Sequence, residues 1–251
     1  MNDADKQPAQ NMRLLIFVLA SNEEAQLKKT VRGLQEQCPP AHVAGIVMFL
    51  APKTTEGCLR TAAALQDPSA PIPTEILQET NLTSPDSVKE ALRARPDVTH
   101  VMFLASDYFL ETSQVVYLIE QAAHDLDHIY KFSRAMPGGR FQPGYPFGAI
   151  PLYRLFCFFI RILYGSKVTD PVFPVMAAPV QLFQRQYQQS SILAGSEFMF
   201  LLMRTKAPIV ELPAYHLPRT EKRGTTNIAF RLRYVGIALR TRFAKEHNDE
   251  S

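Results

Sequence analysis

The chain has 251 residues, of which 46% are hydrophobic and 20% are charged, a composition typical of a globular protein that buries a sizeable core. The formal net charge of +3 is too small to predict nucleic-acid binding, and no nucleic-acid-binding motif accompanies the basic residues. Three cysteines without a Cys-x-x-Cys spacing favour a reducing compartment over a disulfide scaffold.

The first residues of the chain are polar. They lack the succession of basic, apolar and small residues that marks a signal peptide. We expect residues 1–11 and 246–251 to be disordered tails around a single domain at 12–245. The absence of a leader predicts a cytoplasmic protein.

Short apolar runs alternate with helix-length amphipathic segments in the first half of the chain. Four runs are so continuously apolar that we expect strands buried on both faces. These runs are 14–20, 44–50, 74–78 and 99–105. The alternation predicts an α/β fold with a mainly parallel central sheet flanked by helices. Ligands of such sheets bind beyond the carboxyl ends of the strands, which places the expected site near 21–23, 50–53 and 105–108.

The helix after the first strand is predicted from Leu27, Val31 and Leu34, which share one face. Asn22 is the expected N-cap of this helix. Further helices are expected to begin at Thr54 or Thr55, at Ser84 with Pro85 in the first position, and near Thr112.

Two basic amphipathic segments, 151–165 and 228–245, stand out in the second half of the chain. The first is too short, and too interrupted by Arg154 and Arg161, to span a membrane. These arginines are seven residues apart and share a helix face, which leaves Leu155, Phe158, Phe159 and Ile162 largely elsewhere on the cylinder. Each segment fits either an ordinary surface helix or a helix that lies on an anionic membrane, and the presence of two favours the membrane.

Five segments, taken in order, resemble the family 2 glycosyltransferases of the GT-A fold. The resemblance is to the branch that transfers mannose or glucose to dolichyl or polyprenyl phosphate. The segments are LLIFVLASNEEAQLKKTVRGL (14–34), KFSRAMPGGRF (131–141), KVTDPVFPVM (167–176), GSEFMFLLMR (195–204) and PIVELPAYHLPRTEKRGTTNI (208–228). The resemblance implies a single GT-A domain that binds a nucleoside-diphosphate sugar with Mg²⁺ or Mn²⁺.

The same resemblance implies which residues hold the donor. Asn22 and Glu23 occupy the place of the family's base-binding turn, although the pair fits simple helix capping equally well. The other implied donor-binding residues are Ser133, Arg140, Arg219, Arg223 and Asn227. Arginine suits this role because its planar guanidinium donates two parallel bonds to a phosphate. The alternative for the loop that carries Arg219 and Arg223 is a solvated basic loop.

Catalytic roles are implied for Asp107, Arg134 and Asp170. Asp107 would also bind the metal, because it keeps the last carboxylate of the family's Asp-x-Asp motif while Ala105 replaces the first. Each acid has an alternative: Asp107 fits a turn after a strand, and Asp170 fits turn initiation before Pro171.

The sequence thus predicts an inverting, metal-dependent transferase that acts on a lipid phosphate at the inner face of a membrane. Its partners would be the nucleotide sugar, the lipid, the anionic membrane surface and, since the chain has no predicted span, a partner membrane subunit. Ala51, Pro52 and Ala105 stand where the family has carboxylates. Their presence motivates the alternative of a degenerate GT-A domain that binds a nucleotide, lipid or protein without turnover. A third alternative is a transferase for a small acceptor, in which both helices are ordinary.

Overall fold

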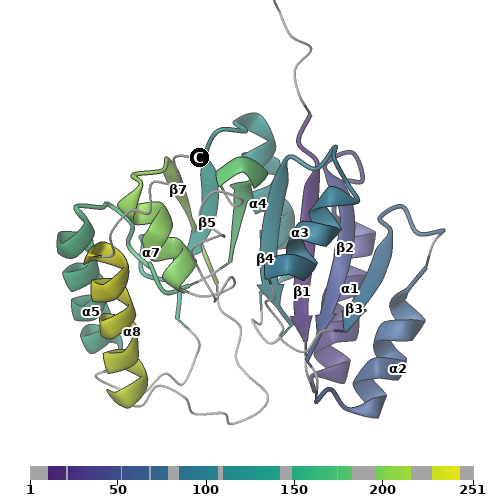
Figure 1. The fold of residues 1–251 in the computed structure, drawn as a ribbon, viewed down its shortest axis with the longest axis horizontal. Helices are drawn as coiled ribbons and strands as arrows, with labels where there is room; N and C mark the ends of the chain where they lie inside the picture. Colours follow the sequence, from purple (N-terminus) through teal and green to yellow (C-terminus); the bar gives the residue numbers. More distant parts are fainter. Residues whose placement is uncertain are drawn as a thin grey trace, which may run out of the picture.

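Seven strands form one sheet in the computed structural model of the protein (Figure 1). The structure describes residues 11–20, 22–51, 53–67, 69–78, 85–106, 110–141, 149–173, 175–182, 196–215 and 228–243. The strands are β1 (Leu14–Ala20), β2 (Val43–Leu50), β3 (Thr74–Gln78), β4 (His100–Ala105), β5 (Ile129–Ser133), β6 (Met176–Pro179) and β7 (Ile209–Pro213). Their order across the sheet is β3-β2-β1-β4-β6-β5-β7. Only β6 runs antiparallel, between β4 and β5.

Helices cover both faces of this sheet. They are α1 (Glu24–Gln37), α2 (Glu56–Leu65), α3 (Pro85–Arg93), α4 (Thr112–His124), α5 (Ala149–Tyr164), α7 (Ser196–Arg204) and α8 (Ile228–Phe243). Buried residues of α1, α2 and α4 form one core cluster, and those of α3, α5, α7 and α8 form the other. Alternate residues of β1 enter the two cores, with Ile16 in the first and Phe17 in the second, as the two-residue period of a strand requires.

The strands of the first half confirm the predicted positions, but β3 lies at the edge of the sheet and is half-buried at Glu75, Ile76 and Leu77, so the expectation of burial on both faces is wrong for this strand. β1 and β3 have the predicted bounds, and β2 and β4 differ by one residue at their starts. Helix α2 begins after the cap Thr55, whose hydroxyl accepts a hydrogen bond from the Cys58 N–H. Helices α3 and α4 begin at the predicted Pro85 and Thr112.

One strand in the second half of the chain and one cap in the turn after β1 differ from the prediction. β6 is only four residues long and pairs in the antiparallel sense, so it shows no long apolar run. Asn22 is not the N-cap of α1; Glu23 takes that position, without a side-chain capping bond. The Asn22 side chain instead bonds the turn after β2, because its carbonyl oxygen accepts a hydrogen bond from the Thr55 N–H at 3.1 Å.

Segments at both ends of the chain lie outside the described residues. Of the predicted tails, only Asn11 is described. The predicted start of α5, residue 151, lies two residues after the observed start, and the predicted start of α8, residue 228, is the observed one. Among the described residues, no helix combines the length and apolarity needed to cross a bilayer.

Gly138 and Gly139 shape the turn after β5. Gly138 has φ +84°, a conformation that favours glycine. A Cβ on Gly139 would lie 2.5 Å from the carbonyl oxygen of Ser133 and 2.9 Å from the carbonyl carbon of Arg134. The turn therefore folds back against the end of β5 only because residue 139 has no side chain.

Gly139→Ala is expected to lower the free energy of unfolding by about 1–3 kcal/mol, since the added methyl group meets backbone that cannot move aside freely. Gly236→Ala in α8 is the matched control. Apart from the backbone of its own helix, no atom of the described residues lies within 4 Å of its added Cβ, and alanine favours a helix over glycine, so this change is expected to be neutral or stabilising. Thermal unfolding of both variants checks this, and equal melting temperatures would contradict it.

Candidate functional site

The carboxyl ends of the parallel strands meet at one edge of the sheet, the lower edge in Figure 1. The hydrogen bond between Asn22 and the Thr55 N–H joins the turns after β1 and β2 at this edge. The Thr55 hydroxyl also donates to Glu24 Oε1, at 3.3 Å. Gly57 lies so close to Glu24 that a Cβ would overlap its carboxylate. The Asn22 N–H donates to Glu23 Oε2 at 3.0 Å. The two predicted base-binding residues therefore lie at the expected edge.

The described residues that precede the predicted metal ligand, Asp107, lie at the same edge. β4 ends at Ala105, and the Ser106 N–H donates to the Leu19 carbonyl oxygen at 2.8 Å. Asp107 itself lies outside the described residues. Within the described ranges, no group of three or more His, Cys, Asp or Glu side chains is placed to hold a metal ion. These residues alone therefore do not form a metal site.

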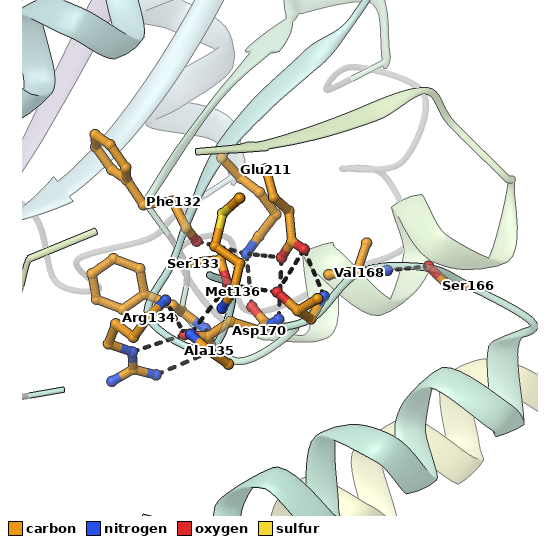
Figure 2. Close-up of polar contacts among 12 residues, drawn as sticks. Phe132, Ser133, Arg134, Ala135, Met136, Ser166, Val168, Asp170 and Glu211 are labelled. Atoms are coloured by element: carbon orange, nitrogen blue, oxygen red, sulfur yellow. Dashed lines mark hydrogen bonds and ion pairs between the residues drawn. The ribbon is translucent and has the colours of Figure 1, made fainter. Parts of the chain in front are cut away.

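Arg134 and Asp170 form a buried ion pair at the end of β5 (Figure 2). Arg134 Nε donates to Asp170 Oδ2 at 2.8 Å, and its Nη2 donates to Oδ1 at 3.2 Å. The Arg134 backbone N–H also donates to Oδ2, at 3.0 Å. Asp170 is fully buried, and 12% of the Arg134 side chain is exposed. Two of the three residues predicted to act in catalysis are thus bonded to each other.

Three aromatic rings and one hydroxyl complete the surroundings of this pair. The Arg134 guanidinium carbon lies 4.5 Å from the ring centre of Phe173, 5.3 Å from that of Tyr153 and 5.5 Å from that of Phe141. Arg134 Nη2 donates to the Tyr153 hydroxyl at 2.9 Å, and that hydroxyl donates to Asp170 Oδ1. Tyr153 therefore connects α5 to the ion pair.

The charges in this cluster decide which groups ionise. Burial alone would raise the pKa of Asp170, but the charge and hydrogen bonds of Arg134 outweigh burial and hold that pKa well below its usual range. Burial raises the pKa of the Tyr153 hydroxyl, so Tyr153 stays neutral and can donate. Burial also raises the pKa of the neighbouring Cys157 thiol, to about 12.

A second buried pair lies behind the first. Lys131 Nζ donates to the carbonyl oxygens of Phe132 at 2.8 Å and Asp170 at 2.7 Å, and lies 3.6 Å from Glu211 Oε1. Glu211 accepts from the Thr169 N–H and hydroxyl, both at 2.7 Å, and from the Asp170 N–H at 3.1 Å. Burial lowers the pKa of Lys131, and the charges of Asp170 and Glu211 oppose this shift. Together the two pairs fix the segment before Pro171 against β5 and β7.

Ser133 and Arg140 have contacts within the protein. Ser133 Oγ lies 2.7 Å from Thr169 Oγ1 and accepts from the N–H groups of Ala135 and Met136. The Arg140 N–H donates to the Ala214 carbonyl oxygen at 2.8 Å, and its guanidinium carbon lies 5.6 Å from the ring centre of Tyr215. Arg140 thereby lies beside the segment that follows β7.

That segment is held by a residue that the sequence did not single out. The Gln114 amide on α4 accepts from the Tyr215 N–H at 2.7 Å and donates to the Tyr215 carbonyl oxygen at 3.0 Å. The predicted donor-binding residues Arg219, Arg223 and Asn227 begin four residues further on and lie outside the described residues.

Sequence reasoning missed Tyr153, Lys131 and Gln114. Tyr153 could have been found, because Tyr153, Cys157, Ile160 and Tyr164 follow the spacing of a buried helical stripe. Lys131 is a charged residue inside a buried strand, a pattern that predicts a paired site. The contacts of Gln114 are 101 residues apart in sequence and leave no local signal.

The outer surface of α5 is apolar. Leu155, Phe158 and Ile162 are 62%, 55% and 66% exposed, although the buried stripe of the same helix already packs against the core. Helix α8 lies beside α5 (Figure 1) and adds Phe243, which is 71% exposed. Two hydrogen bonds join the helices. The Tyr164 hydroxyl donates to the Ala238 carbonyl oxygen at 2.7 Å, and Arg242 Nε donates to the Leu163 carbonyl oxygen at 3.1 Å.

Comparison with known proteins identifies the fold. No protein-family model and no curated protein matches the chain. The chain is similar to glucosyl-3-phosphoglycerate synthase from Mycobacterium tuberculosis, solved with Mn²⁺, UDP and phosphoglyceric acid, at 12% identity over 95% of this chain and 81% of that chain, with a TM-score of 0.64. It is also similar to a mannosyltransferase from Pyrobaculum calidifontis, solved with GDP-Man and Mn²⁺, at 14% identity over 95% and 67%, with a TM-score of 0.59. The mostly parallel seven-stranded sheet is the GT-A fold of these glycosyltransferases.

Asp170→Asn is expected to lower the free energy of unfolding by about 3–5 kcal/mol, because it leaves the Arg134 charge without its buried partner. Asp97→Asn is the control: Asp97 pairs with Arg13 at the surface, where 57% of its side chain is exposed, so the expected loss is below about 1 kcal/mol.

The difference in unfolding free energy between the wild type and Asp170→Asn is expected to shrink as the pH falls. The pKa of Asp170 is lowered in the folded state, so its contribution is present above the unfolded value of about 3.9 and is lost as the pH falls further toward the folded value. Urea unfolding from pH 7 to pH 2.5 is expected to show the wild type and Asp170→Asn converging below about pH 4. Parallel curves throughout would contradict a stabilising role of the Asp170 charge.

Proposed function

We propose that this protein is a glycosyltransferase that moves a sugar from a nucleoside-diphosphate sugar to the phosphate of a polyprenyl or dolichyl lipid, at the inner face of a membrane. The observation that carries the transferase part is the GT-A sheet, shared over more than nine-tenths of this chain with enzymes solved in complex with UDP, UDP-glucose or GDP-Man. Fold alone does not decide activity, so the donor and acceptor parts are argued separately.

The donor is proposed to bind over the carboxyl ends of β1, β2 and β4. Ligands of parallel sheets bind at that edge, where the Asn22 turn and the start of α1 lie. The phosphates would meet Arg140, the Ser133 turn and the loop that carries Arg219, Arg223 and Asn227. The contact between Arg140 and Tyr215 supports this arrangement, because it places one implied phosphate ligand beside the segment that leads into the others.

A divalent metal is proposed as cofactor. Mn²⁺ or Mg²⁺ is present in several of the similar structures. Asp107, with oxygens of the donor diphosphate, would hold the ion here, since hard cations prefer oxygen ligands. When bound, the ion would offset charge on the diphosphate.

The proposed reaction is a single displacement with inversion. A phosphate oxygen of the acceptor forms a bond to the anomeric carbon, and the bond from that carbon to the diphosphate oxygen breaks with its electron pair. The products are a glycosyl phosphate lipid and a nucleoside diphosphate. Because the attacking oxygen is already anionic, the protein supplies positioning and positive charge more than general-base help.

The buried pair has a place in this proposal. The sequence resemblance implies that Arg134 and Asp170 act in catalysis. The contacts of the pair support a positioning role, because Asp170 and Tyr153 take the donors of the Arg134 guanidinium that point into the protein. Arg134 would thereby hold the turn after Ser133 beside the place where the acceptor binds.

Membrane attachment is proposed for the exposed apolar face of α5 and α8. Isolated exposed apolar residues are common, but here five lie together on α5: Leu152, Leu155, Phe158, Phe159 and Ile162. Both helices contain arginines and no acidic residue. Apolar and basic groups together favour an anionic bilayer. A partner membrane subunit would share this face.

The second candidate function is a GT-A domain that binds a nucleotide, lipid or protein without turnover. It is favoured by Ala51, Pro52 and Ala105, which stand where the resembled family has carboxylates. Both candidate functions allow the protein to bind a nucleotide, so nucleotide binding does not distinguish them. Transfer of a sugar does distinguish them.

Titration calorimetry with GDP, UDP, GDP-mannose and UDP-glucose, with and without Mn²⁺, tests the donor site. We expect binding of one nucleotide class that is strengthened at least tenfold by Mn²⁺, and Asp107→Ala is expected to remove that dependence on the metal. Asp97→Asn is the control, because Asp97 is exposed and precedes β4, whereas the expected donor site lies beyond the carboxyl end of that strand. If none of these nucleotides binds to the folded protein, the transferase proposal is wrong.

A further inference from the structure

A cavity of about 480 Å³ opens between α5 and the turn after β5. Its lining combines Ala135, Met136 and Pro137 of the turn, Arg154, Cys157, Phe158 and Arg161 of α5, and Thr169. The turn directly follows the carboxyl end of β5, so the cavity lies at the edge of the sheet where ligands of this fold bind.

The charge of this cavity is wholly positive. Arg154 and Arg161 line it, and no carboxylate does. In the part of the chain that the structure describes, neither arginine forms an ion pair, in contrast to Arg13, Arg60 and Arg95, each of which meets an acidic side chain. The cavity beside β7, of about 530 Å³, differs because its lining includes a carboxylate, Glu211, as well as Lys167 and Lys206.

The spacing of the two arginines suits a doubly charged group. Arg154 and Arg161 are seven positions apart, so they lie on the same side of α5, two turns or roughly 10 Å apart. Their long side chains can therefore converge on one ligand. A phosphate monoester carries about −1.5 to −2 charges at neutral pH and presents three acceptor oxygens. Two guanidinium groups match that charge and can each donate paired hydrogen bonds.

The mouth of the cavity indicates what carries the phosphate. Phe158 lines the cavity and is 55% exposed, and it belongs to the apolar outer face formed with Leu155 and Ile162. Cys157 and Tyr153, on the inner side of the same helix, are buried. The arginines therefore lie between the protein body and an exposed apolar surface, the arrangement that a lipid with a phosphate head group requires.

We infer that this cavity binds the phosphate monoester of the lipid acceptor between Arg154 and Arg161, with the lipid chain leaving across Phe158 along the outer face of α5. The inference rests on the proposed function and adds the acceptor site to it. The Arg134–Asp170 pair lies behind the cavity wall and holds it in place, because Asp170 directly follows Thr169 and Tyr153 precedes Arg154.

Vesicle binding without nucleotide or metal tests this site. The probes are phosphatidylcholine vesicles that contain phosphatidic acid, a lipid phosphate monoester, or enough phosphatidylglycerol, a diester, to give equal surface charge. The wild type is expected to bind the phosphatidic acid vesicles at least tenfold more tightly. Arg154→Ala/Arg161→Ala is expected to remove this preference.

Lys167→Ala/Arg240→Ala is the matched control, since it also removes two positive charges near α5 but neither residue lines the cavity. This control is expected to weaken binding to both vesicles and to keep the preference. The inference is overturned if the preference survives in Arg154→Ala/Arg161→Ala, or if the control abolishes it equally.

Two further arms separate the alternatives. Glycerol 3-phosphate that binds as tightly as the phosphatidic acid vesicles, and loses affinity in the same variant, would overturn the lipid part and assign the cavity to a soluble phosphate. Failure of the nucleotide titrations would overturn the transferase proposal. Failure of the vesicle test with intact nucleotide binding would overturn the acceptor site alone.

Discussion

The buried ion pair between Arg134 and Asp170 is the contact that joins the elements of the second half of the chain. It joins the end of β5 to the segment before β6, and through Tyr153 it also fixes α5. A fully buried carboxylate is costly unless it is paired and hydrogen-bonded, and here both carboxylate oxygens of Asp170 accept hydrogen bonds. Together with the core packing of α5 and its bonds to α8, the charge pair therefore holds the cavity and the apolar outer face in position.

The first half of the chain is organised differently. Its central strands β1 and β2 are apolar on both faces and contain no buried charge, and its turns are joined by exposed contacts such as the bond from the Thr55 N–H to Asn22. The carboxylates that the resembled family places at these turns are absent at 51, 52 and 105. In the proposed reaction, donor affinity would then depend on Asp107 and on the basic loop after β7.

The sequence predicted the first half of the chain closely because three of its four strands, β1, β2 and β4, are continuous apolar runs, and a helix-length segment follows each strand. It predicted Arg134, Asp170, Ser133 and Arg140 as site residues, but not that Arg134 and Asp170 bond each other, since they are 36 residues apart. β6 was missed because four residues leave no pattern. The exposure of Phe158 and Ile162 could not be predicted either: periodicity shows that a helix has an apolar face, and only the packing shows which face is covered.

Sugar transfer onto a lipid phosphate is the most direct test of the whole account. The protein would be incubated with GDP-mannose or UDP-glucose, Mn²⁺ and vesicles that contain a polyprenyl phosphate, and the lipids analysed by mass spectrometry. The account predicts a hexosyl phosphate lipid, formed at least tenfold more slowly by Arg154→Ala/Arg161→Ala at limiting acceptor. A folded protein that binds the nucleotide sugar but forms no glycolipid would contradict it and leave a GT-A domain that binds without turnover.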